Sequence, residues 1–174
     1  DNDTNQIFQT YLPTLWSMGH NYIGKPDLPL TGHFMIKNRI PIARGCGFSA
    51  ALSVIAARYL SHHYQLSLNN KQIFELSLFF ENHFHGESSG ADIIGAMSKK
   101  PIWFKKGGEM TPISCHHQGH FYLFDSQEVS QTKQCVDQVK QLNKPDLDKQ
   151  MSLASGLILK GLEQQFYSKE LIMR

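Results

Sequence analysis

Three oxygen-bearing side chains are spaced along the first part of this 174-residue chain in a way that could serve phosphoryl transfer. Ser49 follows a glycine-rich turn, Glu81 lies in a segment with helical periodicity, and Asp92 ends a loop of small residues. A hydroxyl and a carboxylate can hold Mg²⁺ beside phosphate oxygens, and a second carboxylate can orient or deprotonate an attacking hydroxyl. We therefore take these three residues as the candidate catalytic set.

The residues before Ser49 have the composition of an anion-binding turn. The stretch PIARGCGFSAA places Gly45 and Gly47 between an expected strand and an expected buried helix. Glycine permits a tight turn with no side chain in the way of a ligand, and a helix start offers unpaired N–H groups and a positive dipole end. A glycine corner with a serine cap would explain the same residues, so this segment alone does not show function.

Glu81 falls on the expected inward face of a helix over about residues 70–84, since Phe74 and Leu78 precede it at helical spacing. A buried carboxylate costs several kcal/mol unless a cation or a hydrogen-bond donor meets it. The loop that follows, HGESSGAD, contains small residues that permit close approach and ends at Asp92. The alternatives are a partly exposed Glu81 at the helix edge and Asp92 as an ordinary helix cap.

The elements that must position these residues follow from periodicity and from Gly and Pro breakers. Over residues 5–23 we expect two short turns or a helix broken at Pro13, because proline removes a helical hydrogen bond. In chain order we then expect a strand at 31–41, helices at 49–60 and 70–84, a helical turn at 91–97, strands at 101–106 and 121–125, and helices at 128–142 and 147–167. Gly107-Gly108 is the best candidate boundary between two halves.

Composition excludes several classes of protein. Seventeen Lys and Arg against fifteen Asp and Glu leave a net charge of +2, without the basic stripe of a nucleic-acid binder. No apolar run is long enough to span a bilayer, and the first residues do not resemble a signal peptide. Three cysteines without CxxC spacing fit reduced thiols in the cytoplasm, and the histidine pairs lack the spacing of zinc ligands.

The two segments, in this order, resemble the GHMP kinase superfamily and are most similar to mevalonate kinases. That family carries a phosphate loop of the form P-x-x-x-G-L-G-S-S-A-A, then a Glu followed by H-G-x-P-S-G-x-D. The residues that match are Pro41, Gly45, Gly47, Ser49, Ala50, Ala51, Glu81, His85, Gly86, Ser89, Gly90 and Asp92, and the eleven-residue step from Glu to Asp is also the family's. Cys46, Phe48 and Ser88 depart from the pattern.

The resemblance implies a role for each matched position. Asp92 would act on the substrate hydroxyl as general base or orienter, and Ser49 and Glu81 would hold the Mg²⁺ of MgATP. The ATP-binding residues would be Pro41, Gly45, Cys46, Gly47, Phe48, Ser49 and Ala50, and the substrate residues would be His85, Gly86, Ser89, Gly90 and Thr132.

The resemblance also implies an α+β fold of two lobes, the first like the second domain of a small-subunit ribosomal protein and the second ferredoxin-like. Residues 1–107 would form the N-terminal lobe with the phosphate loop and catalytic acids, and residues 108–174 part of the C-terminal lobe. Because the family's first and third motifs are not found, we expect the fold to be incomplete at both ends.

The implied activity is ATP-dependent transfer of a γ-phosphoryl group to mevalonate, a step of isoprenoid precursor synthesis, in the cytoplasm. The alternatives are a phosphomevalonate or sugar-type GHMP kinase and a non-catalytic nucleotide-binding or scaffold protein. The expected partner is a small hydroxylated metabolite, with no nucleic acid and no membrane, and a homodimer is left open.

Overall fold

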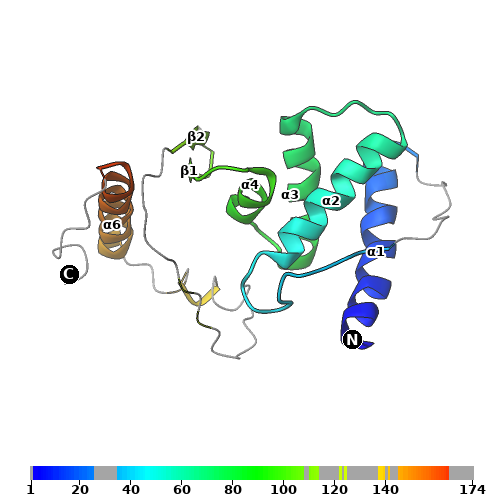
Figure 1. The fold of residues 1–174 in the computed structure, drawn as a ribbon, viewed down its shortest axis with the longest axis horizontal. Coiled ribbons are helices and arrows are strands. Elements are labelled where there is room, and N and C mark those ends of the chain that lie inside the picture. The colour runs from blue at the N-terminus through cyan, green and yellow to red at the C-terminus, as the bar shows by residue number, and fades with distance from the viewer. Residues whose placement is uncertain are drawn as a thin grey trace. The chain divides into compact units, whose positions relative to one another are not determined.

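Four helices pack together in the part of the chain that ends at Met97 (Figure 1). They carry the candidate site residues that the structure describes, except Pro41 and those of the glycine turn and of the loop before Asp92. The structure is a computed structural model. It describes residues 2–25, 35–107, 110–113, 122, 124, 137–139, 141 and 145–164. The chain divides into two compact units, of which the first runs from Asp1 to Met97 with residues 128–130, and the second contains the rest.

Helix α1 (Asn2–Tyr22) is one helix with Pro13 inside it, so the expected break at this residue is wrong. Proline leaves the carbonyl of Gln9 without its helical partner, but Gln9 and Pro13 are both exposed and water can replace the lost bond. The next carbonyl, of Thr10, accepts a hydrogen bond from the Thr14 hydroxyl at 3.2 Å. Two residues after Pro13, fully buried Leu15 anchors the helix in the core, which favours a continuous helix over a broken one.

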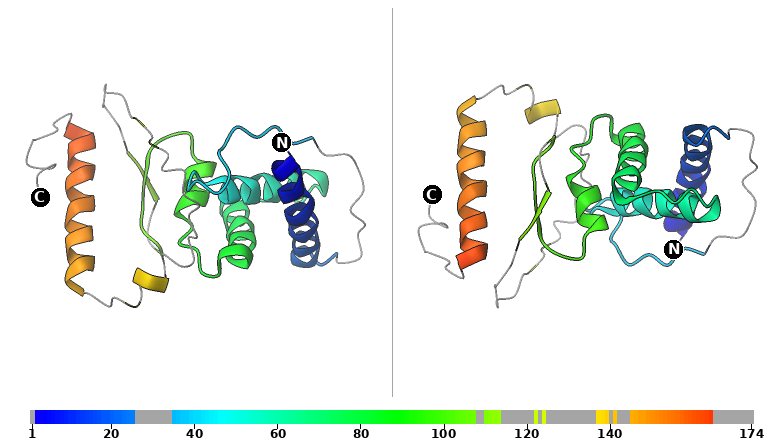
Figure 2. Two further views of the ribbon diagram at one scale, coloured as in Figure 1. Left: turned by 90° about the horizontal axis from the view of Figure 1, so that it is seen from below. Right: turned by 90° about the horizontal axis from the view of Figure 1, so that it is seen from above.

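Helix α2 (Phe48–His63) lies against all three other helices of this unit, as Figure 2 shows from two sides. Its sequence is rich in Ala, Leu and other helix formers, and small Ala side chains allow neighbouring helices to approach closely. The main core cluster contains Leu15, Trp16, Leu52, Ala56, Ala57, Leu60, Ile73, Leu76 and Phe80 from α1, α2 and α3. A second cluster joins Ala50 and Val54 of α2 to Ile93 of α4 (Ala91–Met97).

Helix α3 (Asn70–His85) begins at a capping box formed by Asn69 and Gln72. The Asn69 side chain accepts a hydrogen bond from the Gln72 backbone at 3.0 Å, and the Gln72 side chain accepts one from the Asn69 backbone at 2.9 Å. Its buried face is formed by Ile73, Leu76, Ser77, Phe80 and Glu81. The expected stripe through Phe74 and Leu78 is one edge of this face and packs against the second cluster.

The strand expected at residues 31–41 is not formed in the described part of this segment, since residues 35–41 have no regular secondary structure. The side chain of Asn38 donates to the Ile40 carbonyl and accepts from the Ile40 N–H, both at 2.9 Å. These are the two backbone groups that a neighbouring strand would otherwise satisfy, so a local side chain replaces strand pairing here.

The second unit contains a two-stranded antiparallel sheet and one long helix. Strand β1 (Ile102–Phe104) pairs with β2 (Met110–Pro112), with Trp103 opposite Thr111. Helix α6 (Pro145–Gln164) overlaps the helix expected at 147–167. The strand expected at 121–125 and the helix expected at 128–142 lie mostly outside the described residues. Among the described helices, none is long and apolar enough to cross a membrane.

Helices dominate the described chain and the sheet is small, which fits the α+β expectation in part. The two-lobed arrangement, the ferredoxin-like lobe and a boundary at Gly107-Gly108 stay predictions.

Candidate functional site

The glycine turn before α2 leaves the start of this helix open, and residues 43–47 form the turn expected from the two glycines. Gly45 and Gly47 have φ values of 67° and 72°, a left-handed conformation that glycine adopts without a steric penalty. Gly47 occupies the N-cap position and no side chain caps the helix, so the alternative of a serine cap is wrong. A Cβ at either glycine would meet nothing within 4 Å among the described atoms, which means that a ligand could approach the backbone here.

Phe48 does not close this turn, although it stands where the family pattern has a hydroxyl. Its ring packs edge-on against Phe8 of α1, with 5.8 Å between the ring centroids, and it borders the main core cluster. The bulky side chain is therefore accounted for by packing between α1 and α2. Cys46, two residues earlier, has a half-buried free thiol that donates to the Arg44 carbonyl at 3.6 Å.

Two serines of α2 meet one carboxylate of α3. Ser49 and Ser53 are one helical turn apart, so both face α3. The Ser49 hydroxyl donates to Oε1 of Glu81 at 2.8 Å, and the Ser53 hydroxyl donates to Oε2 at 3.1 Å. Each carboxylate oxygen thus has its own hydroxyl donor, and residues 32 positions apart in the chain are joined.

Glu81 is 4% exposed, so the alternative of an exposed residue at the helix edge is wrong. In the part of the chain that the structure describes, no Lys or Arg forms an ion pair with it. The carboxylate instead depends on two neutral hydroxyls and on His85, one turn further along α3. A buried acid held in this way is satisfied by hydrogen bonds alone and lacks, among the described residues, the cationic partner that would balance its charge.

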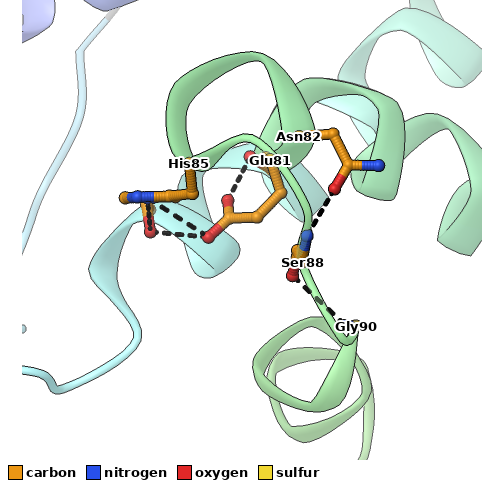
Figure 3. A network of polar contacts seen from close by, with 7 residues as sticks. Glu81, Asn82, His85, Ser88 and Gly90 are labelled. Carbon is orange, nitrogen blue, oxygen red and sulfur yellow. Dashed lines mark hydrogen bonds and ion pairs between the residues drawn. The ribbon is translucent and has the colours of Figure 1, made fainter. Parts of the chain in front are cut away.

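His85 extends the cluster toward solvent, since about a third of its side chain is exposed. Its Nε2 lies 3.2 Å from the Ser49 hydroxyl and 3.6 Å from Oε1 of Glu81 (Figure 3). Because Ser49 gives its single proton to Glu81, its oxygen can only accept, so His85 must carry the proton on Nε2 for this contact to form. The result is a chain of two hydrogen bonds, in which His85 donates to Ser49 and Ser49 donates to Glu81.

The loop after α3 is tied back to the helix by Asn82, whose side chain points away from the Glu81 cluster in Figure 3. Its Oδ1 accepts the backbone N–H of Ser88 at 2.7 Å, and the Ser88 hydroxyl accepts the N–H of Gly90 at 3.2 Å. Gly86 ends α3, and Ser89 accepts the N–H of Ala91 at 3.2 Å. These bonds fix the path of the backbone from Glu81 to Asp92.

Asp92 lies in the first turn of α4 and is exposed. It is the second residue of the helix, so it is not the N-cap that the alternative interpretation required. The structure brings Ser49, Glu81 and His85 together, and no hydrogen bond or ion pair links Asp92 to them. Thr132, the last predicted substrate residue, lies outside the described residues.

Ser53 and Asn82 take part in this site and the sequence reasoning missed both. The signal for Ser53 is present, because it follows Ser49 by four residues on a helix already expected to be buried. Asn82 follows the candidate acid directly, but its contact to the loop depends on the turn at Gly86 and could not be read from helical spacing. Among the described residues, no group of three or more His, Cys, Asp and Glu forms a metal-binding cluster.

Comparison with known proteins finds one family model that matches the first part of the chain. Residues 15–100 match the family model described as GHMP kinases N terminal domain. The match begins in α1 and ends just after α4, so it includes the glycine turn, Glu81 and Asp92. It supports the GHMP kinase superfamily, and it indicates a small-molecule phosphotransferase of a family that generally uses ATP. No curated protein and no solved structure matches the chain.

Proposed function

We propose that this chain provides the nucleotide- and magnesium-binding part of a GHMP-type kinase that transfers the γ-phosphoryl group of ATP to a hydroxyl of mevalonate, in the cytoplasm. The observation that carries the proposal is the hydrogen bond between Ser49 and buried Glu81, at 2.8 Å, beside an uncapped helix start. Both residues lie within the segment that matches the GHMP kinases N terminal domain.

The start of α2 supports a role in binding the triphosphate. The first backbone N–H groups of a helix have no partner within the helix, and no side chain replaces that partner here. These groups and the helix dipole favour a phosphate group, and the open space at Gly45 and Gly47 allows it to come close.

The donor atoms next to this turn fit Mg²⁺. Magnesium binds through one or two carboxylates together with hydroxyl, water and phosphate oxygens, and Ser49 and Glu81 supply one hydroxyl and one carboxylate. When bound, the ion would neutralise charge that develops on the transferred phosphoryl group. Glu81 and Ser49 would hold it, and His85 would keep Ser49 oriented.

Asp92 is the proposed general base or orienter for the acceptor hydroxyl. It is exposed at the start of α4, within reach of solvent and hence of a substrate. The loop of residues 86–90 that leads to it is held by Asn82 and would line the acceptor's side. Mevalonate is the first choice of acceptor, because the order and spacing of the two motifs are most similar to those of mevalonate kinases.

The proposal is tested by measuring ADP release in a coupled assay with mevalonate, phosphomevalonate and a panel of sugars and hydroxy acids. We expect turnover on mevalonate, and we expect Asp92→Asn to lower it by about 10²- to 10⁴-fold, the usual contribution of a general acid or base.

Asp146→Asn is the matched control for this assay. Asp146 is also an exposed acid at the second position of a helix, α6, so the substitution changes the same charge at the same kind of helix start. Asp146→Asn should leave turnover unchanged. ATP binding without turnover on any acceptor would instead identify a non-catalytic nucleotide-binding protein, and the absence of ATP binding would contradict the proposal as a whole.

A further inference from the structure

Ser53 behaves differently from three other helical hydroxyls in the part of the chain that the structure describes. Thr14, Ser77 and Ser155 each donate to the carbonyl oxygen four residues earlier in their own helix, at 3.2, 2.7 and 2.8 Å. This is the usual contact of a hydroxyl within a helix. Ser53 instead donates across to another helix, to Oε2 of Glu81 at 3.1 Å.

The contact fixes which way the Glu81 carboxylate faces. The final torsion of a Glu side chain is broad and can rotate with little cost, so one donor does not determine the orientation of both oxygens. Ser49 holds Oε1 and Ser53 holds Oε2, and the two donors lie one helical turn apart on α2. Together they direct Oε1 toward the start of α2 and keep Oε2 on the inner side.

Ser53 cannot reach a ligand at the helix start by itself. Its side chain is 1% exposed and lies in the interior between α2 and α3. Any influence on a bound ion must therefore pass through the carboxylate. In metal sites, groups that hold a ligand in this way change metal affinity although they do not touch the metal.

We propose that Ser53 is a positioning residue for the divalent cation of the bound nucleotide and that it acts through Glu81. The inference rests on the proposed function, since it requires that Glu81 contacts the cation. It adds a residue that the family resemblance of the chain did not include among the site residues.

The test is isothermal titration of the chain with ADP, in the presence of magnesium and in its absence. We expect Ser53→Ala to weaken binding of ADP with magnesium about tenfold, as removal of a residue behind a metal ligand does, while binding without magnesium changes less than about twofold. Ser53→Thr keeps the hydroxyl and should bind like the wild type.

Ser77→Ala is the matched control. Ser77 is a buried helical serine like Ser53, with 0% against 1% exposure, but it donates to a backbone carbonyl and not to Glu81. Its removal tests the effect of losing a buried hydroxyl, and it should change the two affinities equally and by less than about twofold.

A double-mutant cycle with Glu81→Gln separates positioning from general packing. If Ser53 acts through Glu81, Ser53→Ala should have no further effect on the magnesium-dependent affinity in the Glu81→Gln background. If Ser53→Ala does not fold, as judged by circular dichroism, Ser53→Cys replaces it, because it keeps the volume but is a much weaker donor.

Equal losses with and without magnesium in Ser53→Ala would overturn the inference and leave Ser53 a packing residue, while the proposed function would stand. A wild-type chain whose ADP affinity does not depend on magnesium would overturn the proposed magnesium site itself, and the inference with it. The wild-type titration therefore distinguishes the two failures.

Discussion

The polar groups at the two ends of α2 are satisfied in different ways. At the C-terminal end, the Tyr64 backbone N–H donates to the Leu60 carbonyl at 3.0 Å, and its hydroxyl lies 2.8 Å from Nε2 of His20. His20 is 2% exposed, so a buried polar group finds its partner within the fold. At the N-terminal end, no side chain caps the helix and the nearest polar cluster is built around buried Glu81.

The difference separates groups that stabilise the fold from groups that are available to a ligand. Aromatic rings close the C-terminal end, where Trp16 packs on Tyr59 with 4.7 Å between centroids and Lys25 lies 5.7 Å from the Tyr64 ring centroid. Such contacts bury apolar surface and stabilise the native state. The N-terminal end keeps unpaired backbone donors and a buried carboxylate without Lys or Arg among the described residues, an arrangement that a phosphate and a cation would complete.

The largest expected effect on stability is at the C-terminal end of α2, where aromatic rings cover the helix. Leu60 is fully buried between α1, α2 and α3, so Leu60→Ala should lower the free energy of unfolding by about 3 kcal/mol. Ile55 lies on the same helix and is 58% exposed, so Ile55→Ala should change it by less than about 0.5 kcal/mol. Urea unfolding followed by circular dichroism measures both free energies. Equal decreases in the two variants would show that burial of Leu60 contributes no more to stability than the exposed Ile55 does.

A smaller effect is expected in the loop that leads from the end of α3 to Asp92. Gly90 has a φ of 82°, and a Cβ there would lie 2.8 Å from Cζ of Phe74. Gly90→Ala should therefore destabilise the chain by about 1–3 kcal/mol. Gly95 is the matched control, since it is helical with nothing within 4 Å of its Cβ position, and Gly95→Ala should stabilise by about 0.5–1 kcal/mol. Thermal unfolding should show shifts of opposite sign, and shifts of the same sign would contradict this geometry.

The smallest effect concerns the contact between Tyr64 and His20. Tyr64→Phe removes one hydrogen bond and should cost about 1 kcal/mol. Burial, with a smaller contribution from nearby Tyr59, raises the pKa of Tyr64 above its usual 10.0.

The sign of the pH dependence follows from that shift. Above pH 10 the unfolded chain loses the tyrosine proton before the folded chain does, so this contribution to stability is complete below pH 10 and is lost as the pH rises through the folded pKa. Unfolding curves of the wild type and Tyr64→Phe, measured between pH 8 and 11, should therefore converge as the pH rises (the range is about one to two units on either side of the usual value). A difference that stays constant would contradict the raised pKa.

The sequence predicted the helices around the site better than the segments that enter it. Helical periodicity placed α3, and the inward position of Glu81 is confirmed by its 4% exposure. These signals are local, since they depend on which residues lie one turn apart. The glycine turn was predicted on the same local basis, because Gly45 and Gly47 need a left-handed backbone.

The wrong predictions concern residues whose contacts cannot be read from their own conformational preference. Pro13 predicts a broken helix by its own chemistry, and burial of Leu15 against other helices overrides that preference. Residues 35–41 look extended, but Asn38 satisfies the backbone locally in place of a neighbouring strand. The pairing of His20 with Tyr64, 44 residues apart, has no periodic signal in the sequence.

The central claim, that buried Glu81 serves a nucleotide-bound cation, is tested most directly by the magnesium dependence of ADP affinity in Glu81→Gln and Glu75→Gln. Glu75 is an exposed glutamate on the same helix, 3.9 Å from Lys71, and supplies the control. We predict that magnesium strengthens ADP binding in the wild type and in Glu75→Gln, and that Glu81→Gln loses about 10- to 100-fold of affinity only when magnesium is present. An equal loss without magnesium would contradict the claim and make Glu81 a structural residue.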